Sequence, residues 1–336
     1  MTVLDLDSGR GCRVGVEERG KAMRAVWLKE FGGPGVLVAG DAPDPVAGAG
    51  QVLVEVRFAN VTFVETQFRA GDGQGPFKGE PPLIPGNGVG GVVAAVGDGA
   101  DPGLLGARVV SGTGGSGGYA ELAAVDAAGL FVVPEGLALD DAVALLADGR
   151  TATLMMGAAS PRAGERVLVE AAAGGVGTLL VQLAKAAGAE VVAAAGGDRK
   201  GAVARDVGAD VVVDYTRPGW TRTAGPVDVV FDGVGGDIGR AAFDLLRRGG
   251  RMVSFGLASG EWAGVPEEKA RARGVALVQP RPTPELLRAA TESALDEARA
   301  GRLRPVIGQR FPLERAADAH AAIESRATVG KTLLEV

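Results

Sequence analysis

The sequence has almost none of the side chains that bind zinc through sulfur or imidazole. Cys12 is the only cysteine and His320 the only histidine among 336 residues. A disulfide within the chain and a four-cysteine zinc site are therefore impossible, and a catalytic zinc site built from Cys and His is nearly so. No cluster of Asp and Glu suggests a magnesium site. We predict a protein without a metal.

An excess of basic residues and long apolar runs are also missing. The chain has 35 Lys and Arg against 41 Asp and Glu, without a basic stripe, so we expect no nucleic-acid partner. Charges or glycines interrupt every apolar run before it reaches the length of a membrane span. Residues 1–20 lack the apolar centre of a secretory signal. We predict a soluble cytoplasmic protein.

Glycine, by contrast, is abundant, with 55 residues set at turns between runs of Ala, Val and Leu. This arrangement is typical of a folded α/β protein with tight connections. Residues 23–146 alternate apolar and polar side chains, as in 51–61, or form short runs broken by Gly and Pro. They predict a mostly β domain. Residues 142–147 and 151–157 look helical.

After Pro161 the pattern changes to Val-rich strands separated by helices, which predicts parallel βαβ units. The predicted strands cover residues 166–170, 190–195, 211–214, 227–232 and 251–255, and the predicted helices cover 176–187, 199–207 and 238–246. The remaining segments are predicted as a strand at 275–279, a helix at 283–300, a β-type run at 305–311, a helix at 313–325 and a strand at 331–336.

Residues 166–177 (RVLVEAAAGGVG) pass from an apolar strand into a glycine cluster that opens an amphipathic helix. Backbone N–H groups at such a helix start bind a pyrophosphate, and larger side chains would hold the phosphate off. On the G-x-G-x-x-G spacing, Ala172 replaces the first glycine, while Gly174 and Gly177 keep the second and third. A glycine turn in an unrelated α/β fold is the alternative. The strand before and the helix after favour a dinucleotide site.

The second strand of this unit ends at residues 193–196 (AAAG), without the acid that binds the ribose 2′-hydroxyl in NAD enzymes. Arg199 and Lys200 follow, and cations are what a 2′-phosphate needs. Asp198 lies beside them, and the solvated first turn of a helix is the other explanation for these charges. The missing acid favours NADPH.

Several motifs together are similar to one family. They are Ile84-Pro85-Gly86, Gly118-Tyr119-Ala120-Glu121, residues 171–177, 210–215, 232–236 (DGVGG) and 253–256 (VSFG), and Ala319-His320 followed by Glu324-Ser325-Arg326. From about Met23 to the C-terminus, the chain resembles the zeta-crystallin-like quinone oxidoreductases of the medium-chain dehydrogenase/reductase superfamily. Where the zinc enzymes of that superfamily have His-Glu after Pro-Gly, this chain has Asn87-Gly88, which favours the zinc-free subgroup.

The resemblance implies an α/β protein in two domains after an N-terminal extension at residues 1–22. A mostly β, GroES-like catalytic domain is formed by residues 23–148 and 278–336. A doubly wound Rossmann domain at 149–277 binds NADPH, which donates a hydride to a small-molecule quinone or enone. The strand at 251–257 is predicted near the sheet edge, and relatives pair there, so we expect a homodimer through the Rossmann domains.

The resemblance also implies roles for single residues. Residues of this chain match the family's pattern at the pyrophosphate turn, at the 2′-phosphate site and beside the nicotinamide. The matching residues are Gly174, Gly175, Val176 and Gly177 for the turn; Lys200, Tyr215 and Arg326, beside Arg199, for the 2′-phosphate; Thr151 beside the nicotinamide; and Gly235, Phe255 and Gly256 for the wall at its ribose.

The substrate side departs from the family pattern. Thr62 stands where relatives carry Asn, Gln67 where close relatives often have Tyr, and Arg150 is an unusual neighbour for Thr151. These four are the candidate catalytic residues, and the proton donor stays open between water and a group such as Thr62 or Arg150. An enone or enoyl reductase of a specialised metabolite, and a non-catalytic NADPH-binding protein, are the rival functions. His320 and Tyr119 are predicted to be structural.

Overall fold

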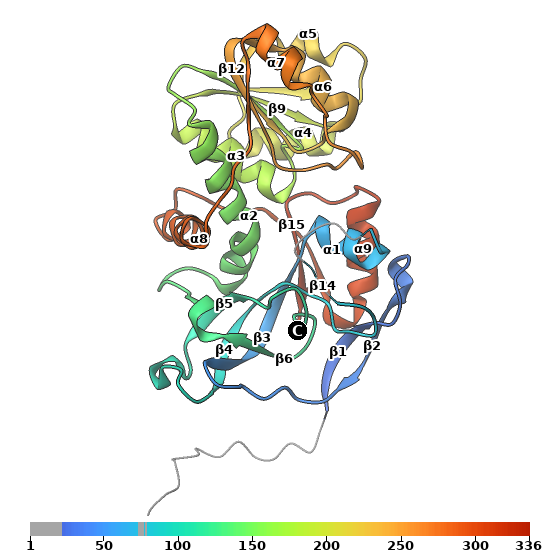
Figure 1. Ribbon diagram of the computed structural model, residues 1–336, viewed down its shortest axis with the longest axis vertical. Helices are drawn as coiled ribbons and strands as arrows, with labels where there is room; N and C mark the ends of the chain where they lie inside the picture. Colours follow the sequence, from blue (N-terminus) through green and yellow to red (C-terminus); the bar gives the residue numbers. More distant parts are fainter. Residues whose placement is uncertain (1–21, 73–76, 78) are drawn as a thin grey trace, which may run out of the picture.

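A computed structural model describes residues 22–72, 77 and 79–336. The chain forms two lobes, with helices α2 and α8 running between them (Figure 1). The predicted N-terminal extension, apart from Ala22, lies outside the described residues, and so does Cys12.

One lobe is built on a six-stranded parallel sheet in the order β10-β9-β8-β11-β12-β13. The strands are β8 (Arg166–Glu170), β9 (Glu190–Ala195), β10 (Val211–Asp214), β11 (Val227–Asp232), β12 (Leu246–Ser254) and β13 (Ala276–Val278). The chain order reverses between β8 and β11, so their carboxyl ends flank the switch point at which such sheets bind ligands. The predicted α/β class with a doubly wound sheet is confirmed.

Helices cover both faces of this sheet because its strands are apolar on both sides. On one face Val167, Val169 and Phe231 join the core of α2 and α3, while on the other Leu168 and Val230 pack with α6. The helices of this lobe are α3 (Gly175–Ala186), α4 (Asp198–Asp206), α5 (Trp220–Ala224), α6 (Gly236–Asp244) and α7 (Glu267–Arg273).

The other lobe contains a seven-stranded sheet and the separate hairpin of β1 (Met23–Leu28) and β2 (Leu37–Ala42). Both ends of the chain contribute, because β15 pairs antiparallel with β3. The sheet strands are β3 (Gln51–Val61), β4 (Gly88–Val96), β5 (Arg108–Gly112), β6 (Leu122–Asp126), β7 (Phe131–Val132), β14 (Ile307–Pro312) and β15 (Lys331–Glu335), with helices α1 (Phe63–Ala70) and α9 (Ala316–Glu324) beside it.

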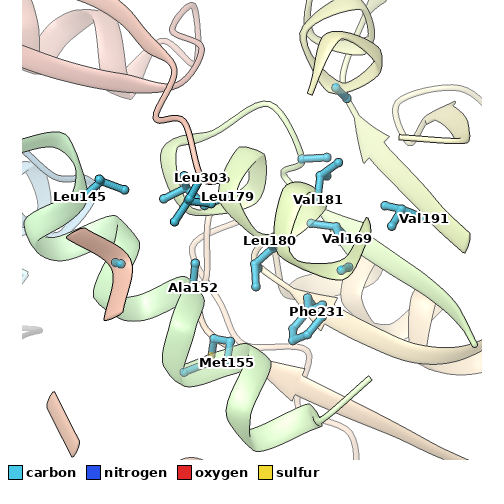
Figure 2. Packing of buried hydrophobic residues seen from close by; sticks show 14 of the residues in the cluster. Leu145, Ala152, Met155, Val169, Leu179, Leu180, Val181, Val191, Phe231 and Leu303 are labelled. Atoms are coloured by element: carbon cyan, nitrogen blue, oxygen red, sulfur yellow. The ribbon is translucent and has the colours of Figure 1, made fainter. Parts of the chain in front are cut away.

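Helix α2 (Leu139–Ala159) is continuous, although the sequence suggested two separate helical segments. Gly149 interrupts the pattern at the predicted boundary between residues 148 and 149. A Cβ there would lie 2.9 Å from the Cβ of Ala294 in α8 (Pro284–Arg299), so the glycine lets two helices approach closely. Figure 2 shows Leu145 and Met155 of α2 within one apolar cluster that reaches the parallel sheet. The two lobes therefore share a core along α2.

Candidate cofactor and substrate site

The glycine turn after β8 has no room for side chains at two of its positions. A Cβ on Gly177 would lie 2.2 Å from the carbonyl oxygen of Ala171, and one on Gly175 would lie 1.9 Å from Oδ2 of Asp148. Gly174 immediately precedes α3, and Val176 packs on the core of that face. The turn therefore holds the start of a 12-residue helix open to an anion, in the shape that a pyrophosphate requires.

The C-terminal segment reaches this turn from the other lobe. Gly330 forms a β-bridge with Gly174, and its N–H donates to the carbonyl of Ala173 at 2.7 Å. The next residue, Lys331, is only 4% exposed, and its Nζ lies 3.0 Å from Oδ1 of Asp148. A buried ion pair thus lies directly beside the glycine turn.

Three cations converge at the start of α4, where Arg326 from the C-terminal segment meets Arg199 and Lys200. The charges of Arg326 and Arg199, together with burial as the larger cause, lower the pKa of Lys200. Arg199 donates to the carbonyl of Ala327 at 2.9 Å, and Arg326 donates to that of Ala258. Within the described ranges these two arginines thus have carbonyl partners, and the positive charge stays uncompensated.

The phenol of Tyr215 lies beside these three cations. Its hydroxyl is hydrogen-bonded by the backbone of Gly196, and burial raises its pKa while the charge of Arg326 acts in the opposite direction. The ring covers Gly196, where a Cβ would lie 3.4 Å from Cε2 of Tyr215. The structure therefore brings together the four residues predicted for the 2′-phosphate, with a phenol among three cations.

The predicted wall at the nicotinamide ribose is formed by loops after β11 and β12. Gly235 has φ +72°, and a Cβ there would lie 2.0 Å from the carbonyl oxygen of Glu261. The ring of Phe255 lies against Gly233, because a Cβ on Gly233 would be 2.6 Å from Cζ of Phe255. A Cβ on Gly256 would be 2.8 Å from the carbonyl oxygen of Gly233. These close backbone approaches bring Gly235, Phe255 and Gly256 to adjacent strand ends.

On the substrate side, Thr62 begins α1 directly after β3. Its backbone N–H and its hydroxyl both donate to Oε2 of Glu65, at 2.6 and 2.9 Å, and the N–H of Asn87 donates to Oε1 at 2.8 Å. Burial raises the pKa of Glu65, while these hydrogen bonds and the charge of Lys331 oppose the shift. The Thr62 hydroxyl is thus engaged with a buried carboxyl, and Gln67 follows half-buried on the same helix.

Helix α2 brings two further candidates. Thr151 is half-buried, and its hydroxyl donates to the carbonyl of Ala147 at 2.8 Å, within the helix. Thr151 lies three residues after Asp148, on the side of α2 that meets the glycine turn. Burial lowers the pKa of the neighbouring Arg150, and the negative charge of Asp148 opposes that shift.

Strand pairing connects the substrate side with the cofactor turn. Val61 of β3 pairs with Thr332 of β15, so Thr62 follows the end of one strand while Lys331 begins the other. Lys331 then contacts Asp148, which lies against Gly175. A continuous path of contacts therefore joins the candidate substrate residues to the candidate pyrophosphate turn.

The single histidine lies away from this path. His320 is fully buried, its Nε2 is 3.0 Å from the hydroxyl of Tyr119, and burial lowers its pKa to about 3. Tyr119 is fully buried too. A neutral, enclosed imidazole cannot exchange protons with a substrate at neutral pH, so the structural role predicted for both residues fits their burial.

Sequence reasoning missed the buried ionisable groups around the site. They are Glu65, Lys331, Glu170 and Asp232. Glu170 and Asp232 each end a mostly apolar run in the sequence, at residues 166–170 (RVLVE) and 227–232 (VDVVFD). Charged residues are rarely fully buried unless paired, so a charge at the end of a fully apolar strand is the available signal.

The described ranges contain no group of three or more His, Cys, Asp or Glu side chains placed to hold a metal ion. No helix among the described residues has the length and apolarity needed to cross a membrane.

The chain is similar to known proteins over nearly its whole length. A quinone oxidoreductase of Pseudomonas aeruginosa is 34% identical over 325 residues, which cover 93% of this chain and 99% of that protein. This chain belongs to the quinone oxidoreductase family. The resemblance to this family of the medium-chain dehydrogenase/reductase superfamily, predicted from the sequence motifs, is confirmed.

Family descriptions match both lobes. Residues 48–135 match the alcohol dehydrogenase GroES-like domain, and residues 207–334 match a family described as zinc-binding dehydrogenase. The predicted GroES-like domain is thereby confirmed.

A solved structure and a second relative extend the comparison. The quinone oxidoreductase of Escherichia coli, solved in complex with NADPH, has a TM-score of 0.84 and 29% identity, and the match covers 93% of this chain and all of that one. A 2-haloacrylate reductase of a Burkholderia species is 30% identical over 92% of this chain and 98% of that protein. Family members thus include proteins named for reducing quinones and for reducing a halogenated alkene acid.

Proposed function

We propose that this chain is an NADPH-dependent reductase that transfers a hydride to a quinone. The observation that carries the cofactor assignment is the convergence of Lys200, Arg199 and Arg326 around Tyr215. Burial, and after it the charges of Arg326 and Arg199, lower the pKa of Lys200, and a bound anion would offset the repulsion among these three cations. A 2′-phosphate is the anion that distinguishes NADPH from NADH, and the relative solved with NADPH has the same fold.

Each part of the site then has a role in binding. The pyrophosphate is held at the start of α3 by the turn of Gly174, Gly175, Val176 and Gly177. This turn depends on its glycines, since a Cβ on Gly175 or Gly177 would collide with neighbouring atoms. Thr151, Gly235, Phe255 and Gly256 form the wall at the nicotinamide and its ribose. NADPH supplies the hydride when it is bound, and the protein supplies orientation and excludes water.

Thr62, Gln67, Arg150 and Thr151 are proposed to contact the substrate. The Thr62 hydroxyl already donates to the buried Glu65, whose two oxygens accept three hydrogen bonds, so a proton given up by this hydroxyl would be replaced from solvent and not from Glu65. Arg150, half-buried on α2, favours an oxygen that becomes negative during reduction. Water remains a third proton source.

The test is the oxidation of NADPH, followed by absorbance, against a panel of quinones, conjugated enones and 2-haloacrylates. Rapid turnover with quinones is expected. No turnover with any acceptor, while NADPH still binds, would favour the rival of a non-catalytic NADPH-binding protein.

An enone or haloacrylate reductase is the second candidate. A 2-haloacrylate reductase covers nearly the whole chain, and Thr62 and Gln67 depart from the family pattern on the substrate side. Higher kcat/KM for these alkenes than for quinones in the same panel would establish it.

We further propose that the enzyme needs no zinc. The whole chain has one cysteine and one histidine, and that histidine is buried against Tyr119. Dialysis against a strong chelator should leave turnover unchanged, whereas a loss restored by added zinc would contradict the proposal.

Domain limits, assembly and location remain proposals as well. We keep residues 23–148 and 278–336 as the catalytic domain and 149–277 as the cofactor domain. The homodimer is proposed through the edge strand β13, because β12 has a neighbour on both sides. A monomer in light scattering at micromolar concentration would exclude the dimer, and cytoplasmic location stays a prediction.

A further inference from the structure

Two carboxyl groups lie side by side at the switch point of the parallel sheet. Glu170 is the last residue of β8 and Asp232 the last of β11, and both are 0% exposed. The strands pair as far as Val169 and Phe231, which places the two acids next to each other where the chain enters the two glycine loops. Neither residue forms a salt bridge within the described ranges, so their charges are not balanced by a cation.

The hydrogen-bond donors around the pair are unequally divided between the two acids. Oδ1 of Asp232 accepts from the N–H groups of Gly235 at 2.7 Å and Val234 at 3.1 Å, and Oδ2 accepts from the Ser254 hydroxyl at 2.8 Å. Asp232 thus accepts hydrogen bonds from three donors. Oε2 of Glu170 has one long contact, from Val234 N–H at 3.2 Å.

Glu170 has what a protonated carboxyl needs. Its Oε1 is buried and has no hydrogen-bond donor among the described residues. Burial and the adjacent charge of Asp232, to which the Glu170 side chain is hydrogen-bonded, raise the pKa of Glu170 well above its usual range. The other ionisable group that interacts with Glu170 is the Tyr215 phenol, which is itself influenced by Arg326. A proton shared between the acids removes the repulsion of two buried negative charges.

We propose that Glu170 is a positioning residue for the dinucleotide: in its protonated form it donates to Asp232, and the pair holds the loop at residues 233–236 in the shape that receives the cofactor. Asp232 supports this loop through the N–H groups of Val234 and Gly235, and Gly235 is the proposed ribose contact. The inference rests on the proposed function, because the loop matters only if a nicotinamide dinucleotide binds there. Loss of the proton places two negative charges beneath the loop and displaces it.

The test is the pH dependence of cofactor affinity. Dissociation constants for NADH are measured by calorimetry from pH 7 upward for the wild type, Glu170→Gln and the exposed control Glu190→Gln. NADH lacks the 2′-phosphate, so titration of Lys200 does not enter. The wild-type dissociation constant should rise by about tenfold for each pH unit above the pKa of the pair, because only the protonated fraction binds well.

Glutamine keeps a donor toward Asp232 and cannot ionise. Glu170→Gln should therefore bind NADH with wild-type affinity at neutral pH and lose the alkaline dependence, while Glu190→Gln should follow the wild type. A Glu170→Gln profile that falls with pH as the wild type does overturns the proposal, as does a wild-type profile that stays flat.

Infrared spectroscopy of the cofactor-free protein provides a second readout. The wild type should show the carbonyl band of a protonated carboxyl that disappears over the same pH range and is absent in Glu170→Gln. A band unchanged by the substitution overturns the assignment of the proton. Failure of wild type to bind either cofactor at any pH would overturn the proposed function, and the infrared band would still report separately on Glu170.

Discussion

The two ends of the cofactor site differ in how their charges are balanced. At the adenosine end, Lys200, Arg199 and Arg326 repel one another, and the two arginines donate to backbone carbonyls. At the substrate end, Lys331 forms an ion pair with Asp148, and Glu65 accepts a hydrogen bond from the Thr62 hydroxyl. The positive charges at the adenosine end need a bound anion to balance them, whereas the charges at the substrate end are balanced by residues of the chain itself. Changes at the first should therefore alter binding, and changes at the second should first alter stability.

The largest effect is expected from Lys331→Met. Removing Lys331 leaves the mostly buried Asp148 without its ion-pair partner, and breaking a buried pair in this way costs about 3–5 kcal/mol. Adding Asp148→Asn should recover much of the loss, because no unpaired charge then remains. The free energy of unfolding in denaturant, followed by two probes because two lobes can unfold separately, measures both effects.

The matched control is Lys269→Met. Its ammonium also contacts one aspartate, Asp244, at 2.8 Å, but both side chains are about half exposed. Exposed pairs contribute about 0–1 kcal/mol, so this change should be nearly neutral. Equal losses for the two lysines would mean that the burial of the Lys331 pair has no energetic importance.

At the adenosine end, Lys200→Ala should weaken NADPH binding by roughly ten- to a hundredfold. A charge-assisted hydrogen bond contributes about 1.5–3 kcal/mol, and about 1.4 kcal/mol is a factor of ten. Arg326→Ala should act in the same direction, and NADH affinity should barely change in either variant. Calorimetry at fixed salt measures both cofactors, because exposed charges are screened.

The control for these variants is Arg299→Ala, which removes an exposed arginine paired with Asp296 on α8. It should leave both dissociation constants unchanged. A wild type that prefers NADH, or variants that weaken both cofactors equally, would show that the cation group does not bind a 2′-phosphate.

A smaller effect is expected from pH. The pKa of Lys200 is lowered by burial and by its neighbouring cations, so in the free protein the lysine loses its proton below the usual alkaline range. The preference for NADPH over NADH should therefore fall as pH rises through that pKa, because the neutral amine no longer attracts the phosphate. Taking the ratio of the two constants cancels any titration that affects both cofactors.

Lys200→Arg tests the source of this dependence. The guanidinium stays charged throughout the accessible range, so the ratio of dissociation constants should become constant with pH. A ratio that still falls in this variant would place the titrating group elsewhere.

The same contrast explains which features could be predicted from the sequence. The glycine turn and the cations after β9 are local signals, since the residues that define them lie within a dozen positions of the strands that present them. The alternation of strands and helices in the parallel sheet is local too. Most of these strands and helices were predicted within a few residues, whereas α5 and α7 were not predicted and β12 begins at Leu246 instead of residue 251. The absence of an acid after β9 is the local signal behind the proposal for residues 199 and 200.

The substrate end depends on contacts that no local pattern contains. Lys331 and Asp148 are 183 positions apart, and only the return of β15 to β3 brings them together. The two helical segments predicted at 142–147 and 151–157 are one helix, and Gly149 between them allows the close approach of α8. Glu170 and Asp232 end separate apolar strands, and their proximity follows from the pairing of β8 with β11. These contacts could not be predicted from the sequence because they depend on the pairing of distant segments.

The smallest effect is expected from Thr62→Asn, the change toward the residue that the family resemblance implies. Threonine and asparagine both begin helices well, so the cost to stability should stay below about 1 kcal/mol. An asparagine amide can still donate to Glu65, but it places a second polar group toward the substrate. A single altered contact in a pocket changes discrimination by about 1–3 kcal/mol, so the ratio of kcat/KM for quinones and enones should shift by roughly tenfold. Thr283→Asn, at the start of α8, provides the control because it makes the same change away from the site. NADPH affinity should stay constant in both variants, and an equal loss on every acceptor would show that Thr62 supports the fold through Glu65 rather than selecting the substrate.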